Sequence, residues 1–349
     1  KALFTITVIF FAAISMLYSQ VEGFPKSGDD EIMQDHIDFR VYGLGTLLVM
    51  EPSPDGDKIA SAGGAGRIYI WDADSGEILD TLVGNNEGFR YLSWSRDGSK
   101  IAAAHIFDHI EIWDVFSGEK IIDIDIFAII IDISLSPDGS KIAIGVNNDT
   151  VYIYDAVSGS LISEIFGGAE DDYYYGPGLS WNPEGDKLFI SFYLYNIIIT
   201  VQDKNEIARS QNTLRHPKWS LDGSKIAGTA VTRYGRIVTI YNATTLDVKS
   251  HFHLPASTIN DLFWAPDGLK IVSADNNIIN IWDFNSQEIK HTLNGHTGNI
   301  LNVHPGKNFE TFFSSSSDHT IRIWDLANDS EKHIISDYSN SVMSIRWIN

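Results

Sequence analysis

The sequence contains no cysteine, and this absence removes several classes of chemistry at once. The chain has no disulfide, no thiolate metal ligand, no cysteine nucleophile and no lipidated N-terminal cysteine. It also lacks a phosphate-binding glycine loop, a nucleophile elbow and a zinc-type His-Glu helix motif. We therefore expect no catalytic residue, no metal site and no cofactor, and a fold stabilised by apolar burial and hydrogen bonds.

Basic residues are scarce. Lysine and arginine number 25 against 46 aspartates and glutamates, so the formal net charge is −21 at pH 7. A surface this acidic repels nucleic-acid phosphates and anionic lipids, and we expect neither as a partner, apart from an N-terminal membrane anchor. The charge keeps the protein soluble, or alternatively attracts a basic partner. A hydrophobic content of 44% with 12% aromatic residues predicts a folded chain.

One short stretch recurs along the chain. In its clearest copy, the turn Ser136-Pro137-Asp138-Gly139 precedes an apolar run and then an alternating segment, residues 150–155. Proline presets φ, aspartate bonds its own backbone and glycine accepts a positive φ, so the turn joins two antiparallel strands. Similar turns occur at 53–56, 95–98, 182–185, 220–223 and 265–268, with a weaker copy at 304–306, and successive turn glycines lie 38 to 46 residues apart.

This period, with four short strands in each unit, is typical of propeller blades. Four units close their third strand with Trp-Asp, at Trp71, Trp113, Trp282 and Trp324. Over roughly residues 37–348 the chain resembles the WD-repeat β-propeller family. The resemblance implies an all-β fold, a seven-bladed WD-repeat β-propeller of four-stranded antiparallel blades. The units are expected at 46–83, 89–127, 130–166, 178–210, 213–254, 258–294 and 299–335.

Two segments flank the seven units. By the resemblance, an early strand at 37–42 pairs with the last blade and closes the ring. Residues 341–348 look like the innermost strand of another unit. They either cap the ring of seven blades or belong to an eighth blade in which the sequence stops.

The N-terminus predicts export. Lys1 precedes an uncharged apolar run of 17 residues that ends before Ser19, which is the pattern of a signal-peptide helix over residues 1–19. Two alternatives remain: an uncleaved membrane anchor, for which 17 residues is short, and a helix of the fold. Residues 20–36 are expected to form a linker. A cleaved signal places the protein outside the cytoplasm, secreted or periplasmic.

The seventh unit keeps the buried hydrogen-bond chain of the family. By resemblance, Asp318 bonds His296, which bonds a serine and the indole N–H of Trp324. Ser314 and Ser316 both fit the serine position, and we assign Ser316. The set looks like a catalytic triad, but we expect a structural role because such groups lie between strands, with no room for a substrate. Trp71, Trp113 and Trp282 are expected to be structural in their own units.

Other polar groups are interpreted as solvated. His251 and His253 share one side of an outer strand, and His105 and His109 flank a turn of the second unit. The acidic trio at 170–172 has carboxylates suited to calcium, but a solvated loop is the simpler interpretation. No spacing selects a pair of carboxylates for glycosidase chemistry.

Aromatic and arginine residues gather in the third to fifth units, in loops that the family places on one face around the central channel. Tyrosine and arginine are enriched in binding hot spots, so we expect a partner-binding patch there. Its predicted members are Tyr173, Tyr174, Tyr175, Tyr193, Tyr195, Arg233, Tyr234 and Arg236.

These patterns predict an exported, non-catalytic scaffold that binds a protein or peptide ligand. The alternative is an exported propeller enzyme, a hydrolase or lyase acting on sugars or peptides, with its site at the channel mouth. Such an enzyme needs convergent carboxylates or a metal there. A third interpretation makes the propeller one part of a longer exported protein.

Overall fold

A computed structural model of the chain describes residues 47–63, 66–72, 78–85, 88–105, 108–168, 177–211, 214–232, 235–253, 259–265, 267–305, 311–318, 320–325 and 330–336. The chain divides into two units, and all of these residues belong to the second, His36–Asn349. The signal peptide, linker and flanking strands predicted above lie outside the described ranges. Within them, no helix is long and apolar enough to cross a bilayer.

The described residues form seven antiparallel sheets of four strands, and in each sheet the strands lie side by side in chain order. The first sheet contains β1 (Leu47–Pro52), β2 (Lys58–Gly63), β3 (Arg67–Asp72) and β4 (Ile78–Val83), and the second contains β5 (Phe89–Trp94), β6 (Lys100–His105), β7 (His109–Asp114) and β8 (Lys120–Asp125). The third sheet contains β9 (Ile130–Leu135), β10 (Lys141–Val146), β11 (Thr150–Asp155) and β12 (Leu161–Phe166), the fourth contains β13 (Gly178–Trp181), β14 (Lys187–Ser191), β15 (Asn196–Thr200) and β16 (Glu206–Ser210), and the fifth contains β17 (Arg215–Trp219), β18 (Lys225–Thr232), β19 (Gly235–Asn242) and β20 (Val248–His253). The sixth sheet contains β21 (Ile259–Trp264), β22 (Lys270–Asp275), β23 (Ile278–Asp283) and β24 (Glu288–Asn294), and the seventh contains β25 (Ile300–Pro305), β26 (Thr311–Ser316), β27 (Thr320–Asp325) and β28 (Ser330–Ser336).

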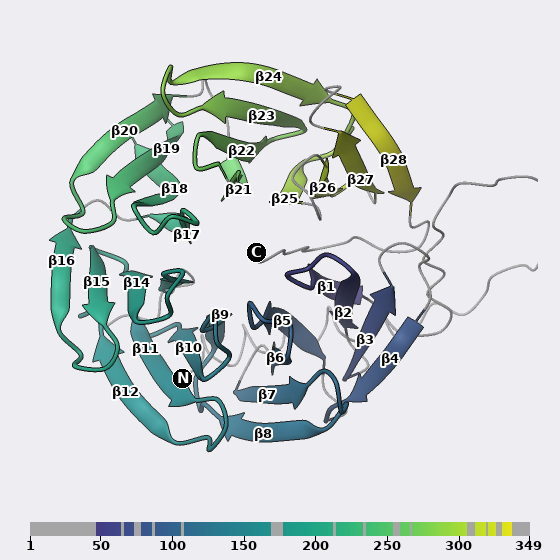
Figure 1. Cartoon of the computed structure of the whole chain (residues 1–349), viewed down its shortest axis with the longest axis vertical. Coiled ribbons are helices and arrows are strands. Elements are labelled where there is room, and N and C mark those ends of the chain that lie inside the picture. The colour runs from purple at the N-terminus through teal and green to yellow at the C-terminus, as the bar shows by residue number, and fades with distance from the viewer. Residues whose placement is uncertain are drawn as a thin grey trace, which may run out of the picture. The chain divides into compact units, whose positions relative to one another are not determined.

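The seven sheets are the blades of a β-propeller. Figure 1 shows them arranged in a circle, with the first strand of each blade toward the centre and the fourth at the rim. The first strands of consecutive blades contact each other from β1 through β5, β9, β13, β17 and β21 to β25. The prediction of a seven-bladed propeller with four-stranded antiparallel blades is confirmed.

The repeated turn has the geometry that its residues predict. In the third blade the Gly139 amide donates to the Ser136 carbonyl at 2.8 Å, and Ser136 Oγ donates to Asp138 Oδ1 at 2.6 Å. Gly139 has φ of 64°, which L side chains rarely adopt. These turns join the first and second strands of each blade, and we call that end of the ring the turn face. Because strands alternate in direction, the second-to-third and blade-to-blade connections lie at the opposite end, the loop face.

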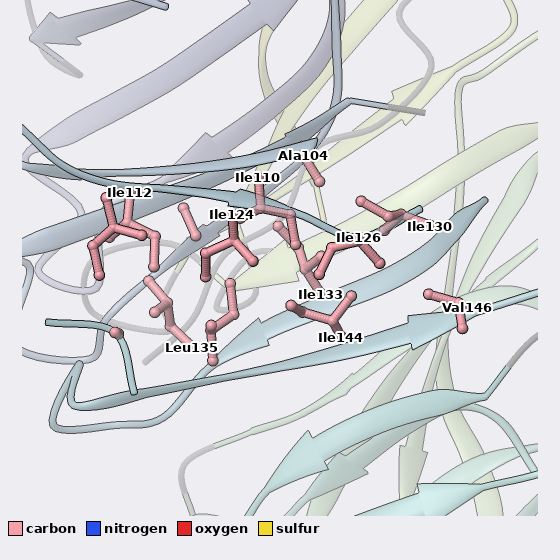
Figure 2. Packing of buried hydrophobic residues seen from close by; sticks show 14 residues of the cluster. Ala104, Ile110, Ile112, Ile124, Ile126, Ile130, Ile133, Leu135, Ile144 and Val146 are labelled. Atoms are coloured by element: carbon pink, nitrogen blue, oxygen red, sulfur yellow. The ribbon is translucent and has the colours of Figure 1, made fainter. Parts of the chain in front are cut away.

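Apolar side chains pack between neighbouring blades. The second strand β10 is buried along nearly its whole length, whereas the rim strand β12 has mostly exposed or half-buried residues. Two-sided burial explains the near-continuous apolar runs of the second strands, because each side of the sheet meets another blade. Figure 2 shows this packing between the second and third blades, where side chains from the facing sheets interlock. The labelled residues are Ala104, Ile110, Ile112, Ile124, Ile126, Ile130, Ile133, Leu135, Ile144 and Val146.

Candidate functional site

The seventh blade contains a buried chain of hydrogen bonds. Asp318 Oδ2 lies 2.9 Å from His296 Nδ1, and His296 Nε2 lies 2.7 Å from Ser314 Oγ. The Trp324 indole donates to the same Ser314 oxygen at 2.8 Å. His296, Ser314 and Trp324 are all at most 3% exposed. These groups therefore fix the blade, and the Ser314 hydroxyl is engaged by its neighbours rather than presented to a substrate.

The serine in this buried series of hydrogen bonds is Ser314, so the assignment of Ser316 is wrong. The register pairs Ser314 with Arg322, two residues before the tryptophan, which brings its hydroxyl within reach of the indole. Ser316 instead accepts a hydrogen bond from the Asp318 amide at 3.2 Å. The same geometry recurs in two other blades: the indole of Trp71 donates to Ser61 and that of Trp282 to Ser273.

Burial and hydrogen bonding shift the pKa values of His296 and Asp318, the two titratable groups in this series of hydrogen bonds. Burial lowers the pKa of His296, although the neighbouring Asp318 opposes this effect, so the imidazole is neutral near pH 7. Burial alone would raise the pKa of Asp318, but hydrogen bonds from Thr320, His296 and the Thr297 amide hold it well below its usual range. The chain is therefore a carboxylate and a neutral imidazole, with Nδ1–H donating to Asp318 and Nε2 accepting from the serine.

The second blade uses different groups at the corresponding place. His105 at the end of β6 is 2% exposed, so the interpretation of a solvated histidine is wrong for this residue. The side chain of His109 is only 13% exposed and contacts Asp123 and Asp125. Within the described ranges, His105, His109 and Glu111 form a group of histidine and carboxylate ligands close enough together to hold one metal ion.

Four tryptophans that sequence patterns did not single out connect the blades. Each ends a first strand, and its indole N–H donates to a backbone carbonyl in the first strand of the preceding blade. The acceptor is the residue one position before the last residue of that strand. The bonds run from Trp94 to Glu51 at 2.8 Å, from Trp181 to Ser134 at 3.0 Å, from Trp219 to Ser180 at 3.0 Å and from Trp264 to Lys218 at 3.2 Å. The signal was present, because each tryptophan directly precedes a repeated turn.

The same tryptophans line a pocket at the turn face, around the centre of the ring. Arg96 and Lys218 bring positive charge to its wall, and the buried His304 also lines it. None of the described residues that line it is aspartate or glutamate. A glycosidase-type pair of carboxylates is therefore not found in this part of the channel mouth.

Three members of the predicted tyrosine and arginine patch lie in the described strands and turns. Tyr193 is 44% exposed in the β14–β15 turn. Tyr195 is half-buried, with its ring 5.2 Å from that of Phe192 and the Arg209 guanidinium 4.0 Å above it, so it packs within the fourth blade. The backbone of Arg236 lies in β19, and its side chain is outside the description. Tyr173, Tyr174, Tyr175, Arg233 and Tyr234 lie outside the described residues.

The remaining candidates are quickly placed. His251 is exposed on the rim strand β20, where its Nδ1 lies 3.2 Å from Thr239 Oγ1. The side chain of His253 and the acidic trio at 170–172 are outside the description.

Two comparisons with known proteins agree with this geometry. The family model for the WD domain, G-beta repeat, matches residues 246–283 and 287–325. Each match begins beside a rim strand, β20 or β24, and ends with the third strand of the following blade. The sequence repeat is therefore offset from the blade by one strand, and each match spans the junction of two blades.

The β-propeller domain of Myceliophteria thermophila Cps50 (Swd1), seen in a crystal structure, has a similar fold. Its TM-score to this chain is 0.70 at 17% sequence identity, and the match covers 81% of this chain and 96% of that domain. At this identity the similarity concerns the fold alone. No curated protein matched the chain by sequence.

Proposed function

Because this chain is a WD-repeat β-propeller, we propose that it is an exported, non-catalytic scaffold that binds a protein ligand through its loop face. Propellers of this family are typical protein-interaction scaffolds. The finer points, export and the location of the binding surface, rest on the N-terminal sequence pattern and on the geometry of one turn.

The observation that carries the proposal is the β14–β15 turn. Tyr193 and Leu194 lie at its tip, 44% and 57% exposed. The Phe192 amide donates to the Tyr195 carbonyl at 2.9 Å and closes the turn. The Tyr193 amide donates to Asp149 of the neighbouring blade at 3.1 Å. The backbone beneath the two exposed side chains is thus held from within its own blade and from the next.

A rigid turn that presents an aromatic and an aliphatic side chain suits protein binding. Tyrosine offers a large contact area together with a hydroxyl, and residues of this kind dominate binding energies. Since the backbone is already ordered, binding would cost little conformational entropy beyond that of the side chains. The buried state of His296 and Ser314 supports a non-catalytic role, because the candidate triad of the chain is occupied in holding Trp324.

Affinity capture tests the binding surface. The full chain is immobilised and exposed to the exported fraction of its source, and the affinity of a retained protein is then measured for two variants. Tyr193→Ala should weaken binding at least about tenfold, as expected for loss of a hot-spot side chain. Phe116→Ala is the matched control, because Phe116 is a 75% exposed aromatic residue in a β7–β8 turn at the opposite end of the ring. Equal affinity of Tyr193→Ala and the unchanged protein would refute the loop-face site.

Export has its own test. The chain with its native N-terminus should be recovered outside the cytoplasm with Gln20 as its first residue. Recovery in the cytoplasm with residues 1–19 attached would refute export, and the same comparison of Tyr193→Ala with Phe116→Ala would then be made on a protein captured from the cytoplasmic fraction.

A further inference from the structure

Two histidines and a glutamate meet at the loop-face end of the second blade. His105 ends β6 and His109 begins β7, so the antiparallel register places the two residues opposite each other. Glu111 follows on the same side of β7, two residues beyond His109. One ligand atom of each residue lies within 4.8 Å of the others. We propose that His105, His109 and Glu111 bind a divalent transition-metal ion, with Zn²⁺ as the best fit.

The distances match the size of such an ion. Ligand atoms about 2.0–2.1 Å from a tetrahedral Zn²⁺ are separated from each other by about 3.4 Å. His109 Nε2 lies 3.7 Å from Glu111 Oε1, so this pair is within a few tenths of an ångström of that separation. The rings of His105 and His109 have their centroids 5.4 Å apart. Small rotations of these side chains bring all three ligands to one point.

Glu111 provides a separate reason to expect a cation. Its side chain is fully buried, although carboxylates are rarely buried without compensation. Glu111 Oε1 accepts from the Asn85 amide at 3.0 Å and from Lys120 Nζ at 3.1 Å. Glu111 Oε2 is buried and has no hydrogen-bond partner among the described residues. A metal ion would use this acceptor capacity and could replace Lys120 as the positive charge beside the carboxylate.

The backbone makes room for this carboxylate. A Cβ atom at Gly84 would lie 2.2 Å from Glu111 Oε2, so any other residue at position 84 would displace the glutamate. The pocket is thus formed by the connection entering the blade as well as by the hairpin.

The charges around the site define what the ion must displace. Lys120 Nζ contacts Glu111 and also Asp123, at 2.8 Å. His109 Nε2 lies 3.0 Å from Asp123 Oδ1 and 3.1 Å from the Asn85 side-chain amide, and His109 Nδ1 lies 2.9 Å from Asp125 Oδ1. When the ion binds, it displaces Lys120 from Glu111, and the ammonium keeps its partner Asp123. His109 binds through Nε2 as a neutral imidazole, and its Nδ1–H donates to Asp125, the second-shell arrangement common for metal-bound histidine.

An ion can reach the site from solvent. Asp123 and Asp125 are 45% and 69% exposed on the rim strand β8, and His109 is partly exposed beside them. Two imidazoles and one carboxylate, with a fourth position open, form a ligand set that suits Zn²⁺. Ca²⁺ and Mg²⁺ prefer sites built entirely from oxygen ligands.

Calorimetric titration of the full chain with ZnCl₂ tests the site, after chelator treatment and removal of any histidine tag. We expect one ion per chain and a rise in the thermal unfolding midpoint, because a ligand that binds only the folded state stabilises it. His109→Gln should weaken binding at least about tenfold, through loss of a direct ligand. Lys120→Gln should tighten binding severalfold, because it removes the competing ammonium. His291→Gln is the control, since His291 is exposed on the rim strand β24.

The combination of variants separates this site from surface binding. Equal weakening by His291→Gln and His109→Gln would assign the binding to solvated histidines and overturn the proposal. Absence of Zn²⁺ binding by both the unchanged chain and Lys120→Gln would overturn it as well. Equal affinity for Ca²⁺ and Zn²⁺ would refute the histidine ligands. Lys120→Gln keeps the test valid if His109→Gln fails to fold, because it leaves all three ligands in place.

Discussion

The second and seventh blades share a backbone and differ in the chemistry at their centre. Both have a buried tryptophan near the end of the third strand, Trp113 and Trp324. In the seventh blade a neutral imidazole, a serine and a carboxylate bond to one another around that indole. Aligned strand by strand, the second blade has Ala103 for Ser314, His105 for Ser316, His109 for Thr320 and Glu111 for Arg322.

The comparison shows which feature the two blades share. The second blade keeps its tryptophan packed, with the rings of Trp113 and Phe89 in a T-shaped contact at 5.7 Å. In place of the hydrogen-bonded groups of the seventh blade it has ionisable side chains. One of them, Glu111, has an oxygen that accepts no hydrogen bond from the described residues. Packing of the indole is therefore common to both blades, whereas the polar groups beside it differ in kind and in their partners.

The largest effect should come from removing the shared tryptophan. Trp324→Ala should lower the free energy of unfolding by about 3–5 kcal/mol, because a large buried ring is replaced by a cavity. Trp113→Ala should fall in the same range, since both side chains are nearly inaccessible to solvent. Chemical denaturation measures both. A loss below about 1 kcal/mol for either variant would show that its ring does not carry the blade.

Removing the seventh-blade serine should have the next largest effect. Ser314→Ala should cost about 2–3 kcal/mol, because His296 Nε2 and the Trp324 indole N–H lose their common partner in a buried place. Ser317→Ala, at an exposed position beyond the same strand, is the control and should change stability by less than about 0.5 kcal/mol. Equal effects of the two variants in denaturant melts would contradict the buried network.

Adding a methyl group to the glycine that precedes the first strand of each blade should change the free energy of unfolding by a smaller amount. Gly84→Ala should cost about 1–2 kcal/mol more than Gly295→Ala. A Cβ at Gly84 meets the buried Glu111 carboxylate at 2.2 Å and the Phe89 ring at 2.6 Å. At Gly295 the nearest atom, 2.6 Å away, is the end of the flexible Arg322 side chain. Urea midpoints of the two variants give the difference, and a greater loss for Gly295→Ala would reverse the comparison.

The smallest effect should be a divergent response to pH. Burial lowers the pKa of His109, but the hydrogen bonds to Asp125 and Asp123 raise it by more than burial lowers it. The pKa of His109 therefore lies above its ordinary value of 6.5. Its contribution to stability is complete below pH 6.5 and is lost as the pH rises through the raised pKa. Burial lowers the pKa of His296, so its contribution is complete above pH 6.5 and is lost as the pH falls.

Unfolding in denaturant between pH 5 and 9, with a chelator present, measures both contributions. His109→Gln should abolish part of the alkaline loss and keep the acid loss. An alkaline loss identical in this variant and the unchanged chain would show that His109 does not gain stability from its carboxylate partners.

The fold could be predicted from sequence because its signals are local and repeated. A turn such as Ser136–Gly139 determines its own φ angles and hydrogen bonds, and seven spaced copies imply a ring. The choice between Ser314 and Ser316 could not be made in the same way. Both serines lie on the same side of β26, and only the register against β27 shows which one reaches the indole.

The second-blade cluster was harder still to predict. His105 and His109 flank a turn, a position that normally exposes polar side chains, and the sequence does not show that Glu111 is buried beside them. Burial here depends on Phe89, the first residue of β5, and on Gly84 in the connection that precedes this strand. The contact between these groups is a property of the folded blade and has no signature in residue spacing.

The indole bonds between first strands have a consequence for how the propeller tolerates change. Each of the four tryptophans is bonded to a fixed backbone position of the preceding blade. The acceptor is always the residue one position before the last residue of that blade's first strand. A one-residue insertion or deletion near the hub would therefore misplace two blades together, its own and the following one. Length variation should accumulate at the perimeter, where an error stays confined to the strand that carries it.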